Sequence, residues 1–144
     1  MSSSLKNNVL KALGVIFAVI ASNIVMKAFN NEPHMTNSEK LIQVSSEINA
    51  NLPMNVDSET VLISTSGFNG AFKYNYQLPN FEVESMDVKE FVADMKLPLI
   101  NAVCTTDDLK AFRDMKIVVS YSYYDSNKNQ IAVIEVDTKE CVKT

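Results

Sequence analysis

The 144-residue chain is poor in several residue types that common catalytic and binding sites require. Its single histidine, His34, lies in a short polar stretch, which excludes the histidine-based catalytic arrangements of common hydrolases. Only three glycines are present, and none is placed where a loop could cradle a phosphate group. No basic cluster occurs and the formal net charge is -4, which argues against nucleic acid as a partner.

The first part of the chain carries an apolar run without charged side chains, Ala12 to Met26, which follows Lys6 and Lys11. This pattern is typical of a membrane-targeting segment. A helix over the run alone would span only about 22 Å, whereas a helix over residues 9–29 reaches about 31 Å, the thickness of a bilayer core. Because the preceding lysines favour a cytoplasmic amino terminus, we predict a single-pass anchor in the inner membrane with the rest of the chain on the periplasmic side.

Two other readings of this run stay open. It could be a cleaved signal peptide, with Val19-Ile20-Ala21 before Ser22 as the cleavage site, although apolar residues continue past the cut. It could also be a buried helix of the core, which its length disfavours. With retention as the leading reading, we divide the chain into an anchor or signal segment (1–29), a linker (30–35) and an exported domain (36–144).

The exported domain shows a helical pattern followed by a hairpin pattern. Thr36 or Ser38 can cap a first helix, which Pro53 stops. Residues 60–66 form a β-branched run, and residues 72–78 alternate strictly between apolar and polar types, with turn residues 67–70 between the two runs. The apolar positions of the expected helix recur at intervals of three and four: Leu41, Val44, Ile48 and Leu52.

The second half repeats this order. We expect a helix that Ser85 opens, that Pro98 divides and that ends near Cys104. Thr105 and Asp108 resemble a capping box before a short helix over residues 107–115. A second hairpin follows, with strands 117–124 and 130–136. The predicted fold class is α+β: an N-terminal membrane helix, then a four-stranded, mainly antiparallel sheet of two hairpins with helices packed on one face.

Cys104 and Cys141 are the only cysteines of the chain. They lack the Cys-x-x-Cys spacing of a redox pair and the companion ligands of a metal site. Since the domain is predicted to be exported, a structural Cys104–Cys141 disulfide is the natural pairing. The Asp125-x-Asn127-x-Asn129 stretch imitates the start of a calcium loop, but the residues that follow do not continue the motif, so we predict a hairpin turn there, and no metal or cofactor.

Two groups of side chains are candidates for binding. The first is a dense acidic stretch that could meet a basic partner or could be an ordinary solvated face. The second is a set of aromatic residues on the two hairpins, which are more often sheet core than a ligand platform. The acidic residues are Glu82, Glu84, Asp87, Glu90 and Asp94, and the aromatic ones are Phe72, Tyr74, Tyr76, Tyr121, Tyr123 and Tyr124.

The order of several short motifs resembles small bacterial secreted or membrane-anchored proteins of unknown function. The motifs lie between about residues 40 and 141, and the resemblance implies an envelope location without supplying catalytic residues. Members of this group tend to carry glycine where Lys116 stands and in the last hairpin turn, where this chain has residues 127–129. The motifs are Leu52-Pro53-Met54 with Asp57, Thr60 and Leu62, Tyr74-x-Tyr76-x-Leu78, Asn101, Cys104-Thr105, Tyr121-x-Tyr123, and Ile134-x-Val136 before Cys141.

Three function classes follow from these observations. The leading hypothesis is a non-enzymatic binding or assembly module, tethered to the membrane, for another envelope protein. The second is an immunity or inhibitor protein that protects the envelope against a toxin. The third is an enzyme built on carboxylates and tyrosines, which would require a deep pocket lined by two of four acids, Asp57, Glu59, Asp87 and Glu135.

Overall fold

The computed structural model describes residues 34–141, and the following statements concern those residues. The predicted anchor (1–29), its span over residues 9–29 and most of the predicted linker (30–35) lie outside them. Among residues 34–141, no helix combines the length and the apolar character that crossing a bilayer requires.

A single mixed sheet of five strands forms the centre of the domain, in the order β1-β2-β3-β4-β5. The prediction of four strands was wrong because β1 was missed. With only two residues, β1 is too short to show an alternating pattern, and it pairs with the start of β2. The strands are β1 (Met54–Asn55), β2 (Val61–Phe68), β3 (Ala71–Gln77), β4 (Val118–Tyr124) and β5 (Gln130–Asp137).

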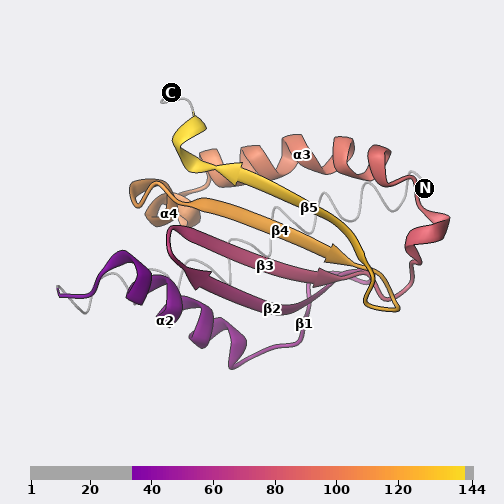
Figure 1. Ribbon diagram of the computed structural model, residues 1–144, viewed down its shortest axis with the longest axis horizontal. Coiled ribbons are helices and arrows are strands. Elements are labelled where there is room, and N and C mark those ends of the chain that lie inside the picture. The colour runs from indigo at the N-terminus through magenta and orange to yellow at the C-terminus, as the bar shows by residue number, and fades with distance from the viewer. Residues whose placement is uncertain (1–33, 142–144) are drawn as a thin grey trace.

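The two predicted hairpins are confirmed, and they join at the middle of the sheet (Figure 1). β3 and β4 run parallel, with Tyr74 opposite Tyr121, whereas the other three strand pairs are antiparallel. A parallel pair requires the chain to cross from the end of one strand to the start of the next, and the helical segment between residues 78 and 117 provides this crossover. The sheet is therefore mixed.

Helix α2 (Asn37–Asn49) begins after Thr36, one of the two residues predicted to cap it. Thr36 Oγ1 accepts a hydrogen bond from the Glu39 N–H at 3.3 Å, and the Glu39 carboxylate accepts one from the Thr36 N–H at 2.7 Å. These reciprocal bonds form a capping box. The Thr36 N–H and hydroxyl, which both donate to the Glu39 carboxylate, hold the pKa of Glu39 below its usual value. The helix ends before Leu52, which was expected to be its last apolar contact.

Helix α3 (Val88–Thr105) differs from its expected form at both its start and its middle. Ser85 belongs to a 3-10 turn, η1 (Val83–Ser85), and Asp87 caps α3 by accepting from the Glu90 N–H at 3.0 Å. Pro98 does not divide the helix. Buried side chains continue along one face before and after Pro98, and their packing offsets the hydrogen bond that proline cannot make; they are Phe91, Met95, Leu99 and Val103.

The predicted capping box at Thr105 was also wrong. Thr105 is the last residue of α3, and its hydroxyl donates back to the Asn101 carbonyl at 2.6 Å. The segment after it forms a 3-10 turn, η2 (Asp107–Leu109), and a short helix, α4 (Lys110–Asp114). A last 3-10 turn, η3 (Thr138–Glu140), follows β5.

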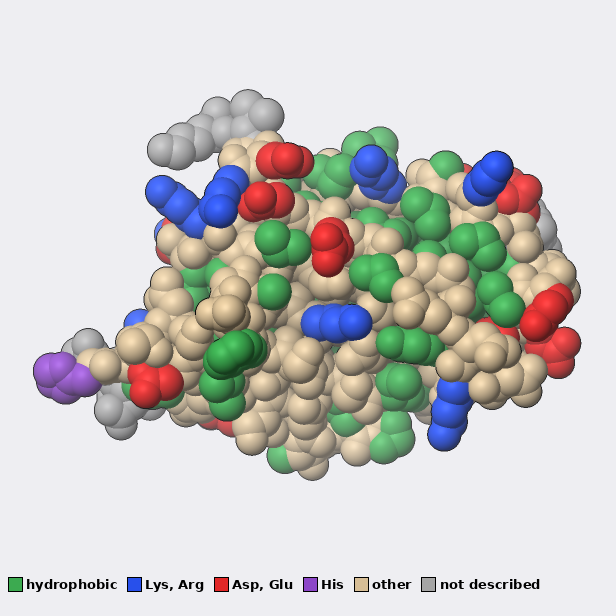
Figure 2. All heavy atoms as spheres, in the orientation of Figure 1, with side chains coloured by type: hydrophobic (Ala, Val, Ile, Leu, Met, Phe, Trp, Pro, Cys, Tyr) green, Lys and Arg blue, Asp and Glu red, His purple; other side chains and the backbone are tan. Residues whose placement is uncertain are grey.

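The helices pack on one face of the sheet, here called the inner face. On it, Gly67 lies so close to the backbone of α2 at Leu41 that any larger side chain would clash. Phe112 of α4 lies against Phe72, and Phe91 of α3 meets Tyr123 edge to face. The opposite face carries mainly small and polar side chains of β2 to β5, together with the exposed Val133 of β5. Figure 2 views the molecule from the direction of Figure 1.

Among residues 34–141, three residues other than glycine have left-handed backbone conformations, with positive φ angles. Asn69 (φ 55°) precedes Gly70 (φ 81°) in the β2–β3 turn, the pairing that a two-residue hairpin favours. The others are Lys116 (φ 55°), before β4, and Lys128 (φ 66°), in the β4–β5 turn. These are the positions at which the resembling proteins tend to carry glycine. A lysine adopts the same conformation here, although its Cβ makes the left-handed region energetically unfavourable.

Candidate binding surface

Asp125 lies fully buried at the end of β4 and joins two loops. Its carboxylate accepts four hydrogen bonds: from the backbone N–H groups of Val83 (3.1 Å), Asn127 (2.8 Å) and Asn129 (2.7 Å), and from the Asn129 side-chain amide (3.1 Å). Burial by itself raises the pKa of Asp125, but these donors outweigh it and hold the pKa below its usual value. Asp125, which opens the stretch that imitates a calcium loop, therefore has a structural role: its carboxylate holds the two loops together.

Further bonds fix the same two loops. The Ser126 N–H donates to the Phe81 carbonyl at 2.8 Å, and the Leu78 N–H donates to the Tyr124 carbonyl at 2.8 Å. The Gln77 side-chain amide reaches the carbonyls of Asp125 (3.2 Å) and Ser126 (3.3 Å). Residues 78–87 are thus held against the β4–β5 turn at the end of the sheet where β3 and β4 finish.

The predicted partner-binding acids lie on this fixed segment and on the first two turns of α3. Asp87 has a structural part as well, because it caps α3. Two lysines, Lys89 and Lys96, are exposed on the same helix. We use the name acidic surface for the exposed acids Glu82, Glu84, Asp87 and Glu90 together with the half-buried Asp94.

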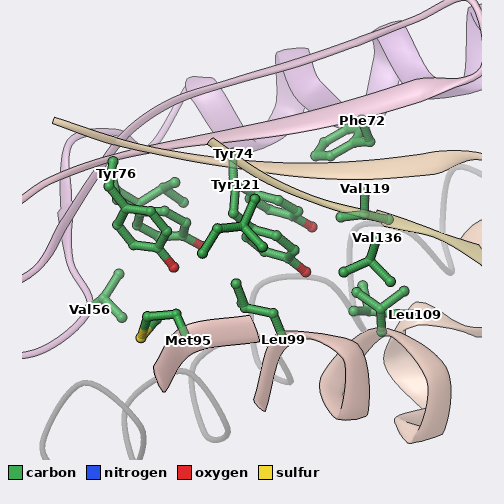
Figure 3. Packing of buried hydrophobic residues seen from close by; sticks show 14 of the residues in the cluster. Val56, Phe72, Tyr74, Tyr76, Met95, Leu99, Leu109, Val119, Tyr121 and Val136 are labelled. Carbon is green, nitrogen blue, oxygen red and sulfur yellow. The ribbon is translucent and has the colours of Figure 1, made fainter. Parts of the chain in front are cut away.

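The sheet aromatics lie in the core (Figure 3). Tyr74 stacks on Tyr121 with ring centroids 5.6 Å apart, and Tyr76 stacks on Tyr123 at 5.5 Å. Tyr74, Tyr76 and Tyr121 point toward α3, where Met95 and Leu99 face them. Burial raises the pKa of all four phenols, so they stay neutral at physiological pH. With Phe72, these side chains are 0–3% exposed and present no open platform to a ligand; Tyr124, at the strand end, is half-buried.

Of the four carboxylates considered for acid–base chemistry, two share a loop and the other two lie on different elements. Asp57 and Glu59 lie in the β1–β2 loop, where the Asp57 carboxylate accepts from the Glu59 N–H at 2.7 Å. Asp87 caps α3, and Glu135 is exposed on β5. Within residues 34–141, no group of three or more His, Cys, Asp or Glu side chains is placed to hold a metal ion.

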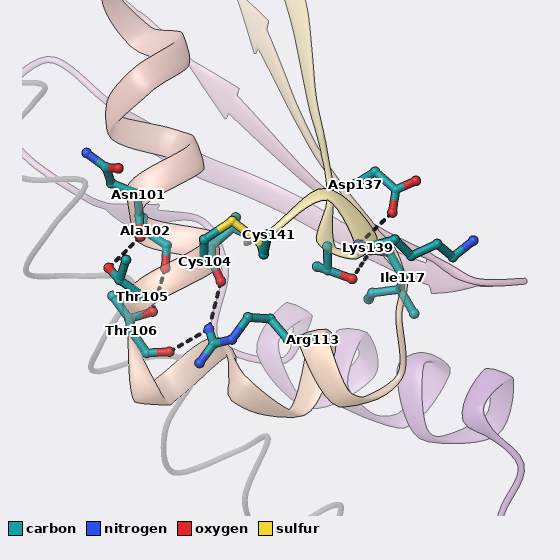
Figure 4. The surroundings of a disulfide bond; sticks show 12 residues. Asn101, Ala102, Cys104, Thr105, Thr106, Arg113, Ile117, Asp137, Lys139 and Cys141 are labelled. Carbon is teal, nitrogen blue, oxygen red and sulfur yellow. Dashed lines mark hydrogen bonds between the residues drawn. A yellow bond between two sulfur atoms is a disulfide. The ribbon is translucent and has the colours of Figure 1, made fainter. Parts of the chain in front are cut away.

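The predicted Cys104–Cys141 disulfide is confirmed, and it joins the last turn of α3 to the residue that follows η3 (Figure 4). Nearby, Arg113 Nη1 donates to the carbonyls of Val103 and Thr106, each at 2.7 Å. The guanidinium therefore satisfies carbonyl groups at the C-terminal end of α3, which the helix itself leaves free. The sequence did not predict this role of Arg113, because an isolated arginine belongs to no motif whose spacing could indicate its partners.

Comparison with solved structures shows that other proteins share this fold. No family model matches the chain. The chain has the fold of a candidate secreted protein from Pseudomonas aeruginosa, with a TM-score of 0.59 and 12% identity, over 88% of this chain and 97% of the other. A second solved structure with this fold is the pilotin EpsS of the Vibrio vulnificus type II secretion system, with a TM-score of 0.53 and 12% identity, over 92% and 97%.

In sequence, the chain is similar to Protein K of Escherichia coli. The two are 33% identical over 87 residues, which make up 59% of this chain and 46% of that protein. The chain thus spans about half the length of the curated relative that it matches.

Proposed function

We propose that this protein is a non-enzymatic assembly module that binds another envelope protein through its acidic surface. The observation that carries the proposal is the fold, which is shared over most of the chain with a component of a type II secretion system. A protein of that system acts among envelope proteins, and we extend the same kind of partner to this chain.

The acidic surface suits such a partner on physical grounds. Four of its five acids are exposed, and the segment that carries Glu82 and Glu84 is fixed by the buried Asp125. A surface that is already ordered loses little conformational freedom on binding. Its charge favours a partner segment rich in lysine or arginine, because complementary charges speed the encounter and select the partner.

The proposed location follows from the sequence division. Residues 1–29 would hold the chain in the inner membrane, residues 30–35 would form the linker, and residues 36–144 would lie on the periplasmic side. The disulfide supports an oxidising compartment, since such bonds persist mainly outside the cytosol.

The test is a cross-linking capture from membranes with a charge-reversed variant. Replacing Glu82, Glu84 and Glu90 by lysine should reduce recovery of the partner and should leave the melting temperature nearly unchanged, because surface substitutions usually change stability by no more than about 0.5 kcal/mol. The matched control reverses three exposed acids away from the acidic surface, Asp107, Glu135 and Glu140. It should retain the partner.

Salt provides a second readout. Charges across an interface are screened beyond about 8 Å at physiological ionic strength, so recovery of the partner should fall as salt rises. Equal recovery of the same partner by the wild type, the variant and the control would show that the acidic surface is only solvated.

A further inference from the structure

Two of the four large hydrophobic side chains that are exposed within residues 34–141 lie at one corner of the domain. Phe68, at the tip of the β2–β3 hairpin, is 64% exposed, and Ile42, on α2, is 47% exposed. The Asn69 N–H donates to Ser38 Oγ at 3.3 Å, which fixes the hairpin tip against the first turn of α2. Ile42 follows Ser38 by four residues and so lies on the same side of the helix. Phe68 and Ile42 are here called the apolar corner.

The apolar corner lies where the preceding part of the chain is attached. α2 begins at Asn37, one residue before the serine that holds the hairpin tip. From Phe29, the end of the predicted span, the chain to Asn37 can extend over at most about 29 Å. If residues 9–29 lie in a bilayer, this corner is the part of the domain that the short linker holds nearest to the lipid.

The charges of the domain favour the same orientation. The Val118 N–H donates to the Gly70 carbonyl at 2.9 Å, so the exposed Lys116 lies on the turn beside the hairpin tip. The acidic surface lies at the opposite end of the sheet, where β3 and β4 finish, as Figure 1 shows. An anionic lipid surface attracts a nearby lysine, and it would repel the acidic surface if that end were the one turned to the lipid, so the orientation with the corner toward the bilayer is favoured.

We propose that the apolar corner contacts the lipid surface and orients the domain, with the acidic surface turned away from the membrane. Phe68 and Ile42 lie among the headgroups and the first acyl carbons, and Lys116 lies at the phosphate level. This inference rests on the membrane location given under the proposed function, and it is independent of the acidic surface as the partner site. It explains why large apolar side chains stay uncovered at the tip of an ordered hairpin.

The absence of tryptophan from the chain allows a direct test by fluorescence. The full-length chain is reconstituted in vesicles of phosphatidylethanolamine and phosphatidylglycerol, with Phe68→Trp as the reporter. Leu97→Trp is the matched control, because Leu97 is also 64% exposed but lies on α3, which packs along the other edge of the sheet. Brominated phosphatidylcholine, added to the vesicles, quenches only a tryptophan that reaches the acyl chains.

Quenching of Phe68→Trp several-fold above that of Leu97→Trp, together with a blue-shifted emission, supports the contact. Equal quenching of the two reporters, or none at Phe68→Trp, overturns it. Melting curves of both variants in detergent check that each is folded. The vesicles contain no partner protein, so the quenching of Phe68→Trp reports the lipid contact alone, and loss of the partner in the capture experiment is a separate result.

Discussion

The side chain of Asn49 pairs with the backbone of Thr65 as a neighbouring strand would. Asn49 Oδ1 accepts from the Thr65 N–H at 2.7 Å, and its amide nitrogen donates to the Thr65 carbonyl at 2.8 Å. The Thr65 hydroxyl adds a third bond, to Asn49 Oδ1 at 3.0 Å. β1 pairs with β2 only at Val61 and Leu62, so this asparagine at the end of α2 closes part of an edge that would otherwise be open to pairing with another chain.

Replacing Asn49 by alanine should therefore lower the free energy of unfolding by about 1–3 kcal/mol, because it leaves the backbone groups of the buried Thr65 without partners. Urea unfolding followed by circular dichroism measures the change. Asn51→Ala is the control, since the Asn51 side chain donates only to the carbonyl of Glu47 within its own segment. A loss of similar size in both variants would contradict the strand-like function of Asn49.

Asp125 should make stability depend on pH in the acidic range. Its pKa is lower in the folded state than in the unfolded chain, so its ionised form contributes stability above the unfolded value of about 4, and this contribution is lost as the pH falls through the folded value. Asp125→Asn should lower stability at neutral pH and should make stability depend less on pH in the acidic range. Thermal melts of both proteins from neutral to acidic pH measure the difference, and Asp107→Asn, at an exposed position, should follow the wild type.

Two lysines occupy backbone conformations that suit glycine. Lys116→Gly and Lys128→Gly should each raise the free energy of unfolding by up to about 1 kcal/mol, because a side chain in the left-handed region costs about 1–2 kcal/mol and part of that gain is offset by the flexibility of glycine in the unfolded chain. Lys96→Gly, within α3, should instead lower it by about 1 kcal/mol. Chemical denaturation of the three variants checks the signs, and destabilisation by both turn substitutions would be evidence against this account.

The Cys104–Cys141 bond closes a loop across the last helices and the second hairpin, with a sequence separation of 37. Cys104→Ser, Cys141→Ser or the double variant should lower the free energy of unfolding by about 2–4 kcal/mol. Denaturation with and without a thiol reductant supplies the control, because reduction should weaken the wild type and leave the double variant unaffected. Complete alkylation of both cysteines in the unreduced protein would refute the bond.

Local patterns predicted most of the elements. Thr36 was one of two predicted caps for the start of α2, and strict alternation from Phe72 to Leu78 identified β3. The disulfide followed from the number of cysteines and the predicted export. The patterns for α2 and β3 each lie within one segment, and the chain has only two cysteines to pair. The sequence alone was therefore sufficient to predict these features.

Features that depend on the assembled fold were missed. β1 is defined by its partner strand, and continuity of α3 through Pro98 depends on what its buried face packs against. The structural role of Asp125 was missed because one of its donors, the Val83 N–H, becomes adjacent only when two loops meet. The acidic surface was predicted as a set of residues, and whether a partner binds it stays a prediction.

The parallel pairing of Tyr74 with Tyr121 has a consequence for the order of folding. Each hairpin closes a short loop, whereas β3 and β4 pair only after the chain has crossed through α3 and α4. This pairing is slow because the entropy of closing the long loop is lost before the two strands meet. The amide hydrogens between β3 and β4 should therefore gain protection last during refolding. In the finished domain, exchange at those amides should require the two hairpins to separate, so they should report the stability of the whole fold.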